Sequence, residues 1–254
     1  MTRLSAAERL LQDLGVTEPK EIDLEAIAFH LGARVRYRAL EGCEAQIVGC
    51  NECAIITVNR HSAPRRKRFS IAHELGHWCY HRGERLTCRA EEIRPRDPTS
   101  PERVADNYAA DLLMPLYLFE PAARAEPKFT FKAVLDLAEK FETSVTATAI
   151  RLVEAGRFPA LLVCHGSRGK KWFTRNRDVP TRWFPRADLD SESFAFGVLF
   201  GGKTDDPMPR KIGADAWFER RDADRYMLLE QTFRTGSDEI LTLVTITDEE
   251  MLEE

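Results

Sequence analysis

The sequence contains no apolar run that is long enough to cross a membrane. A spanning helix needs at least about 18 consecutive, mostly apolar residues, and no window of this chain approaches that length. Residues 1–9 also lack the charged segment followed by an apolar segment that marks a secretion signal. We therefore expect a cytoplasmic protein that has no contact with a membrane.

An excess of positive charge is missing as well. The chain has 37 lysines and arginines against 41 aspartates and glutamates, which gives a formal net charge of −4. Its overall charge therefore does not indicate a nucleic-acid partner, and any contact with nucleic acid would have to be local.

The cysteines carry only half of a zinc-knuckle pattern. There are six cysteines, and without an export signal they are expected to be reduced thiols. Cys50 and Cys53 have Cys-x-x-Cys spacing, but no second copy of this spacing follows. Two interpretations stay open, a metal or redox role and a hairpin turn that happens to carry two thiols, and the missing second copy favours the hairpin.

The chain does contain enough apolar side chains for a core. Hydrophobic residues make up 43% of its 254 residues and charged residues 31%, which is typical of a globular protein. At about 150 residues per domain, this length corresponds to one large domain or two modest ones. We find no internal repeat.

Apolar periodicity predicts mixed structure in the first sixty residues. Helical spacing extends over residues 4–15, and residues 23–32 form a second helix with Asp23 as its N-cap and Gly32 just past its end. Alternating residues then predict three strands, the last two joined as a hairpin, at residues 33–38, 44–48 and 54–59.

The next segment contains the motif His73-Glu74-Leu-Gly-His77. On a helix, positions i and i+4 lie on one face, so the two imidazoles can converge on one metal ion. Glu74 would then lie beside a water whose pKa zinc lowers towards about 7, and its carboxylate could take the proton. The alternative is a buried amphipathic helix that happens to carry these residues.

After the motif, a proline-containing loop at residues 84–101 leads into another predicted helix, which carries acidic residues. This helix is predicted from Pro101 to Pro115, and Glu102 and Asp106 lie one turn apart on one stripe. The arrangement suits Glu102 as a third zinc ligand, and Asp106 as the acceptor for the free N–H of a ligating histidine. An ordinary charged helix start would also place acidic residues here.

Two segments together, AIITVN…RFSIAHELGHWCYHRG and ERVADNYAADLLMP, resemble the ImmA/IrrE family of zinc metallopeptidases. That family joins a HExxH helix to a later helix of the form E-x-x-A-(N/D)-x-(F/Y)-A-x-x-L-L-x-P. The resemblance covers residues 20–120. It implies a zincin-like peptidase in which His73, His77 and Glu102 hold zinc and Glu74 is the catalytic base.

The sequence departs from the family pattern at two positions. Val104 stands where many members have a second glutamate, which leaves Glu102 as the candidate ligand in that stretch. Asp106 stands where members often have asparagine, and it keeps a hydrogen-bond acceptor there. A site of two imidazoles and one carboxylate would also hold manganese or iron.

Two residues beyond the second histidine are candidates to support the transition state. Tyr80 and His81 could donate to the tetrahedral intermediate, and His81 lies four residues after His77 on the same helix face. The alternative is that both residues only support the core. An exposed edge strand among residues 44–58 would bind an extended peptide by strand addition, but the sequence does not say which strand is the edge.

Residues 131–156 show a helix–turn–helix pattern, and members of the family commonly carry such a segment after the protease core. The second helix of the pair has Arg151 but few lysines, so it lacks a strong surface for phosphate binding. The pattern therefore favours a structural or partner-binding helical pair over DNA binding.

Beyond residue 158 the chain is expected to form a small antiparallel sheet, which would be a sensor-like module of the kind that some family members carry. Turn residues separate the predicted strands, which lie at residues 160–164, 171–174, 194–200, 214–218, 226–233 and 240–246. Residues 248–254 are expected to be a solvated tail.

The predicted fold class is α+β: a mainly helical zincin-like core with a small antiparallel sheet, a helix–turn–helix-like pair and a C-terminal β-rich, α/β sensor-like module. The three parts correspond to a metallopeptidase domain at residues 1–125, the helical pair at residues 126–157 and the β-rich module at residues 158–254.

The expected function is that of a zinc-dependent, site-specific endopeptidase. The resemblance implies that the substrate is a transcriptional repressor, often of the helix–turn–helix type, in a stress, phage or mobile-element response. Since the sequence has no repressor-like domain at its N-terminus, we expect the target to be a separate protein. The alternative is a non-proteolytic regulator or DNA-binding factor that uses the zinc fold as a scaffold.

Overall fold

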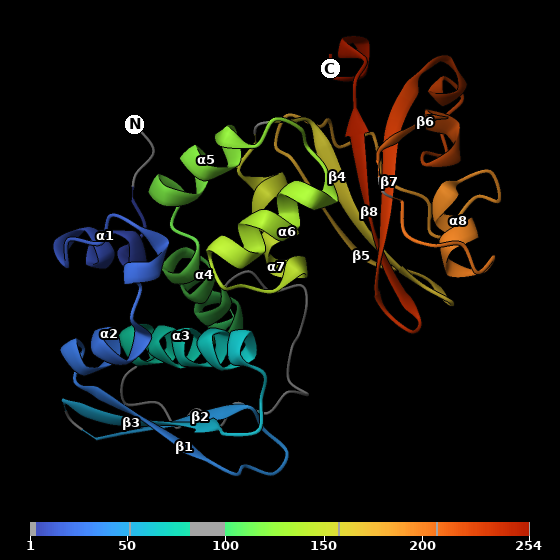
Figure 1. Ribbon diagram of the computed structural model, residues 1–254. Helices are drawn as coiled ribbons and strands as arrows, with labels where there is room; N and C mark the ends of the chain where they lie inside the picture. The colour runs from blue at the N-terminus through green and yellow to red at the C-terminus, as the bar shows by residue number, and fades with distance from the viewer. Residues whose placement is uncertain (1–3, 51, 82–99, 157, 207, 254) are drawn as a thin grey trace. The chain divides into compact units, whose positions relative to one another are not determined.

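The computed structural model describes residues 4–50, 52–81, 100–156, 158–206 and 208–253 (Figure 1). These residues form eight α-helices and two sheets, which confirms the α+β class. None of the helices in the described residues is both long and apolar enough to cross a bilayer. Almost all of the loop expected at residues 84–101 lies outside the described residues.

The chain divides into two compact units. The first unit is Met1–Pro121 with Ala138–Ser144, and the second is Ala122–Leu137 with Val145–Glu254. The division therefore runs through the helical pair at residues 131–156. The three-part division expected from the sequence stays a prediction.

Two short helices open the first unit, and both were expected. Helix α1 (Ala6–Asp13) begins with a capping box in which Ser5 and Glu8 exchange hydrogen bonds between side chain and backbone. Helix α2 (Leu24–His30) is capped by Asp23, whose carboxylate accepts two backbone N–H groups. Gly32 follows α2 with a φ of +81°, a left-handed conformation that suits glycine. The 3₁₀ turn η1 (Pro19–Glu21) lies between the two helices.

The first sheet has the strand order β1-β3-β2. Strands β2 (Ala45–Cys50) and β3 (Cys53–Asn59) form the expected antiparallel hairpin. Strand β1 (Ala33–Arg38) runs parallel to β3, so the expected antiparallel sheet is in fact mixed. Because β3 lies in the middle, β1 and β2 are the edge strands of this sheet within the described residues.

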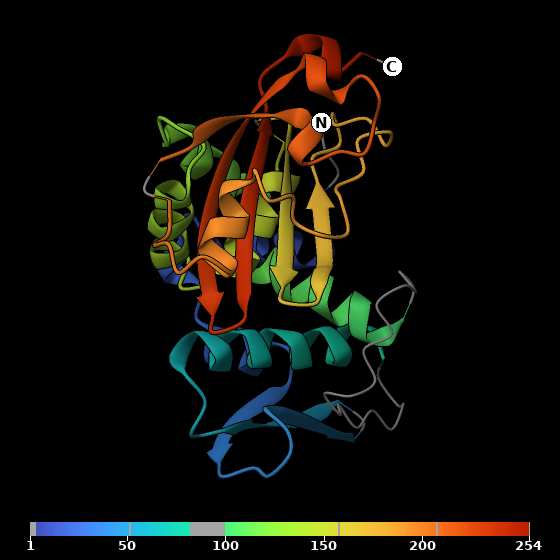
Figure 2. The same cartoon turned by 90° about the vertical axis from the view of Figure 1, so that its right-hand side faces the viewer.

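Helix α3 (Pro64–Tyr80) carries the histidine motif and packs against both the sheet and helix α4 (Pro101–Leu113) (Figures 1 and 2). Small residues bring the two helices close together. A Cβ built at Gly76 would lie 2.8 Å from the Cα of Ala105, and Ala105 and Ala109 are fully buried. These small residues allow the close packing of α3 against α4. Helix α5 (Leu116–Ala125), which was not predicted, follows α4.

The expected helical pair consists of α6 (Phe131–Lys140) and α7 (Val145–Glu154). The turn between them contains Glu142, whose φ of 53° is left-handed. Helix α7 packs on strands β4 (Ala160–Gly166) and β5 (Gly169–Arg175) of the second unit.

The second sheet has the order β5-β4-β8-β7-β6, and all of its neighbouring strands are antiparallel, as expected. Its remaining strands are β6 (Arg210–Gly213), β7 (Met227–Gly236) and β8 (Glu239–Ile246). Within this unit, α7 and helix α8 (Phe194–Leu199) lie on opposite faces of the sheet (Figure 1).

Three local predictions in the second unit are wrong. Residues 194–200 were expected to be a strand but form α8, because the Ser193 side chain accepts the Phe196 N–H and caps a helix. Residues 214–218 contain the 3₁₀ turn η2 (Ala214–Ala216) instead of a strand. The tail is not fully solvated. It forms the 3₁₀ turn η4 (Glu249–Met251), in which Met251 is buried and its carbonyl accepts the Trp183 indole N–H at 2.6 Å. A further 3₁₀ turn, η3, covers Ala223–Arg225.

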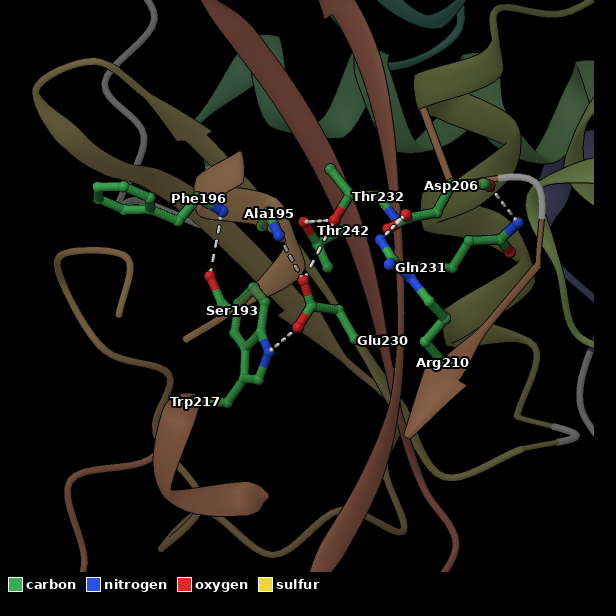
Figure 3. A network of polar contacts seen from close by, with 10 residues as sticks. All are labelled: Ser193, Ala195, Phe196, Asp206, Arg210, Trp217, Glu230, Gln231, Thr232 and Thr242. Carbon is green, nitrogen blue, oxygen red and sulfur yellow. Dashed lines mark hydrogen bonds and ion pairs between the residues drawn. The ribbon is translucent and has the colours of Figure 1, made fainter. Parts of the chain in front are cut away.

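A buried polar network crosses the core of the second unit (Figure 3). The Glu230 carboxylate is fully buried, and it accepts the Ala195 N–H at 2.6 Å and the Trp217 indole N–H at 3.0 Å. The hydroxyls of Thr232 and Thr242 lie 3.0 Å apart in the same core. Burial raises the pKa of the Glu230 carboxyl. The network ties α8 and the Trp217 segment to the sheet, which explains why these segments do not add strands to it.

Candidate metal centre

Three side chains from two helices converge in the first unit. His73 and His77 lie one turn apart on α3, and Glu102 lies in the first turn of α4. One donor atom from each residue lies within 4.8 Å of the donor atoms of the other two. The structure therefore brings together the three residues that the sequence proposed as metal ligands.

The donor atoms form a small triangle. The Nε2 atoms of the two histidines are 3.1 Å apart. The Glu102 carboxylate oxygens lie 3.2 Å from His73 Nε2 and 3.4 Å from His77 Nε2. Ligands at zinc bond lengths of about 2.0–2.1 Å in a tetrahedron are about 3.3 Å from one another. The three donors thus match one face of a zinc tetrahedron, and this face leaves a fourth position for water or substrate.

The remaining imidazole nitrogens point to second partners. His73 Nδ1 lies 2.9 Å from Asp106 Oδ1, on the turn of α4 that follows Glu102. His77 Nδ1 lies 3.4 Å from His81 Nδ1. A hydrogen bond from His73 Nδ1–H to Asp106 fixes the tautomer in which Nε2 is free to bind a metal. The placement of Asp106 is therefore the one that its proposed supporting role needs.

The two histidines differ in their electrostatic environment. Burial lowers the pKa of His73, but the hydrogen bond to Asp106 and the nearby carboxylates outweigh burial and leave the pKa raised. The pKa of His77 is lowered to about 4, first by burial and then by the neighbouring imidazoles of His73 and His81. His77 is therefore neutral at physiological pH, which is the form that binds a metal.

Glu74, the proposed base, is the residue after His73 on α3 and is only 1% exposed. Its charge is one of those that raise the pKa of His73. A buried carboxylate beside a metal centre has little competing water, which suits a group that accepts a proton. Its catalytic role stays a prediction.

Tyr80 and His81 lie at the C-terminal end of α3 in different settings. His81 is the C-cap of the helix and faces His77. Tyr80 is 51% exposed and packs edge-on against Tyr108 of α4, with the ring centroids 5.9 Å apart. The structure therefore brings His81, but not Tyr80, into contact with one of the proposed ligands.

Two contacts that support the site were not predicted. Gly76 lets α3 and α4 approach, as described above, and Trp78 anchors the motif helix to the sheet. The Trp78 indole donates to the Leu31 carbonyl at 2.8 Å, and a Cβ at Gly49 would lie 2.5 Å from its ring. For the contact at Gly76, the available signal in the sequence was a glycine in the middle of the motif helix. The contact between Trp78 and Gly49 joins positions 29 residues apart, which the periodicity of one segment cannot reveal.

Known proteins resemble this chain at two levels, a family model and a solved structure. Residues 29–153 match the family model described as the IrrE N-terminal-like domain, a peptidase family. No protein of curated function matches the sequence. A solved structure of a Mycobacterium tuberculosis transcriptional regulator is similar in fold, with a TM-score of 0.61 at 13% sequence identity. That match covers 95% of this chain and 75% of the other chain.

Proposed function

Because residues 29–153 of this chain belong to the family of the IrrE N-terminal-like domain, we propose that the protein is a zinc-dependent endopeptidase. The observation that carries the proposal is the donor triangle of His73, His77 and Glu102, whose edges of 3.1–3.4 Å suit a tetrahedral zinc ion. Manganese or iron would also accept this donor set.

The residues around the donor triangle have different roles in the proposed peptide hydrolysis. A bound zinc would supply a Lewis acid that polarises the scissile carbonyl and makes a water more acidic. Glu74 accepts the proton from the attacking water and then delivers it to the leaving amine. Asp106 orients His73 through its Nδ1, and His81 does the same for His77.

An extended substrate would bind along the edge of the first sheet. Strand β2 is paired with β3 on one side, and it is an edge strand among the described residues. Its Gly49 contacts Trp78, the neighbour of the proposed ligand His77. A peptide that adds to β2 through main-chain hydrogen bonds would therefore run past the metal centre.

A regulatory protein is the proposed substrate, and a helix–turn–helix transcriptional repressor is the most specific candidate. This choice rests on the resemblance in the sequence to the ImmA/IrrE peptidases. The test is co-expression of the chain with the transcriptional regulators encoded beside it, followed by mass spectrometry of each regulator. We expect one discrete cut when zinc or manganese is present.

The control for this experiment is a pair of matched amide variants. Glu74→Gln should abolish the cut, whereas Glu41→Gln, the same change at an exposed position, should leave it unchanged. If no regulator is cut, or if Glu74→Gln retains the biological effect while it binds zinc, the protein is a non-proteolytic regulator instead.

DNA binding through the helical pair is the weaker alternative. Of the residues of α7, only Glu154 is exposed, and its single basic residue, Arg151, is partly buried. A recognition helix that neutralises phosphates needs exposed lysines or arginines. The composition and burial of α7 therefore favour a structural role for this helix.

A further inference from the structure

Cys50 and Cys53 lie opposite each other at the end of the β2–β3 hairpin. They are the last residue of β2 and the first of β3, and they are register partners. Both are free thiols on exposed residues. From this placement we propose that the two thiols form a reversible disulfide, and that closing it weakens metal binding at the neighbouring centre.

The thiols point to the open face of the first sheet. Successive side chains of a strand point to opposite faces, and the Cβ direction of Gly49 leads to Trp78 of α3. Cys50 must therefore point away from α3, as its facing partner Cys53 does. On that same face, Val48 is 67% exposed and Ile55 is 36% exposed. A small disulfide in solution can reach both sulfurs from this side.

The strand register places the two cysteines within bonding range. The Asn59 N–H donates to the Glu44 carbonyl at 2.8 Å, and hydrogen-bonded pairs recur at every second position of an antiparallel ladder. Cys50 and Cys53 are therefore a hydrogen-bonded pair, with Cα atoms about 5.5 Å apart. Disulfides are found at Cα separations of about 4.4–6.8 Å.

Closing the bond requires the end of the hairpin to tighten. Directly opposite Cβ atoms are about 4.5–5.5 Å apart, whereas a disulfide needs about 3.5–4.5 Å. The two strand ends must therefore approach by about 1 Å. A bond formed under such tension is easily reduced, as labile and regulatory disulfides are.

This tightening is transmitted to the metal centre because two residues of the hairpin end, Gly49 and Glu52, are packed closely against their neighbours. A Cβ added at Gly32 would lie 2.5 Å from the Glu52 carbonyl oxygen. A Cβ added at Gly49 would lie 2.5 Å from the ring of Trp78. Trp78 is 5% exposed and is hydrogen-bonded to Leu31. A shift of Cys50 therefore also displaces Gly49 and disturbs its close contact with Trp78, the neighbour of His77.

The oxidant is a low-molecular-weight disulfide of the glutathione type. One of the two thiolates attacks it, forms a mixed disulfide and releases one small thiolate. The second cysteine then attacks the protein sulfur of the mixed disulfide, forms the Cys50–Cys53 bond and releases the second small thiolate. Two protein thiols are oxidised and one small disulfide is reduced to two thiols.

The test uses the full chain loaded with zinc and equilibrated in buffers of oxidised and reduced glutathione. Free thiols are then alkylated and the protein is digested for mass spectrometry. We expect the peptide that spans Cys50 and Cys53 to lose two hydrogen atoms and to regain them with dithiothreitol. Cys50→Ser and Cys53→Ser should instead carry glutathione on the remaining cysteine, whereas Cys43→Ser should behave as the wild type.

The coupling to the metal centre, which rests on the proposed function, is measured separately by zinc competition with a chelating dye. We expect oxidation to weaken zinc binding about tenfold, the size of effect that a disturbed support of a ligand produces. Oxidised Cys50→Ser should keep the affinity of the reduced protein.

Two results would overturn the proposal. If Cys50 and Cys53 both remain alkylated at every glutathione ratio, the pair is not a redox site. If the disulfide forms and zinc affinity does not change, the pair does not act on the metal centre. Neither measurement uses a peptide substrate, so a failure of the peptidase proposal would be seen separately.

Discussion

Replacing Gly76 with alanine tests whether the spacing of α3 and α4 sets the metal centre. The added Cβ would lie 2.8 Å from the Cα and 3.1 Å from the carbonyl oxygen of Ala105, where ordinary contact begins at 3.4 Å. Both atoms belong to the backbone, so the helices must separate by about 0.6 Å at this point. Metal sites tolerate deviations of about 0.2 Å in ligand distance.

The separation moves Glu102, which lies three residues before Ala105 on α4, away from His73 and His77 on α3. We therefore expect zinc affinity to fall at least about tenfold. Overpacking costs about 1–3 kcal/mol, and alanine regains about 1 kcal/mol of helix propensity. The net loss of stability should accordingly stay at or below about 2 kcal/mol, so the variant folds and its zinc affinity can be measured.

The assay is zinc competition with a chelating dye, and urea unfolding reports stability. Gly236→Ala is the matched control, because the nearest atom to its added Cβ is 4.0 Å away. This control should bind zinc as the wild type does. A folded Gly76→Ala variant with wild-type zinc affinity would refute the idea that close packing of the two helices positions the ligands.

Three further perturbations have defined outcomes. Asp106→Ala removes the acceptor 2.9 Å from His73 Nδ1 and should weaken zinc binding about 10–100-fold in dye competition, while Asp106→Asn, which keeps an acceptor, should lose much less. Burial lowers the pKa of His165 to about 4, and neither of its ring nitrogens has a hydrogen-bond partner among the described residues. As the pH falls from about 6.5 to about 4, His165 is protonated in the unfolded chain before it is protonated in the folded protein, so stability should drop by up to about 3 kcal/mol. Urea titrations of His165→Leu should lack this part of the pH dependence. The buried Glu8 carboxylate accepts the Leu116 N–H at 2.7 Å, and Glu8→Ala should cost about 1–3 kcal/mol in urea unfolding because that N–H is left unpaired.

The parts of the fold that the sequence predicted correctly are those with local signals. Asp23 and Gly32 mark both ends of α2 through capping chemistry that lies within the segment itself. The strands of the β2–β3 hairpin and of β4, β7 and β8 follow from β-rich runs bounded by turn residues. The proposed ligands come from two motifs on separate helices, and the structure brings these motifs together.

The parts that the sequence did not reveal depend on contacts between distant residues. The apolar run at 194–200 is too short for periodicity to separate helix from strand. Its helical form is supported by Glu230, which accepts the Ala195 N–H from a strand that comes later in the chain. The parallel pairing of β1 with β3 and the burial of Met251 likewise depend on tertiary packing, which no local pattern encodes.

Glu74 is proposed to act as the base on a water at the His73, His77 and Glu102 centre. The most direct measurement compares zinc content and the cleavage rate of a regulator substrate in the wild type and Glu74→Gln. We expect equal zinc binding, together with a cleavage rate that falls by about 10²–10⁴-fold. Zinc-loaded Glu74→Gln that cleaves at a rate close to the wild type would contradict it.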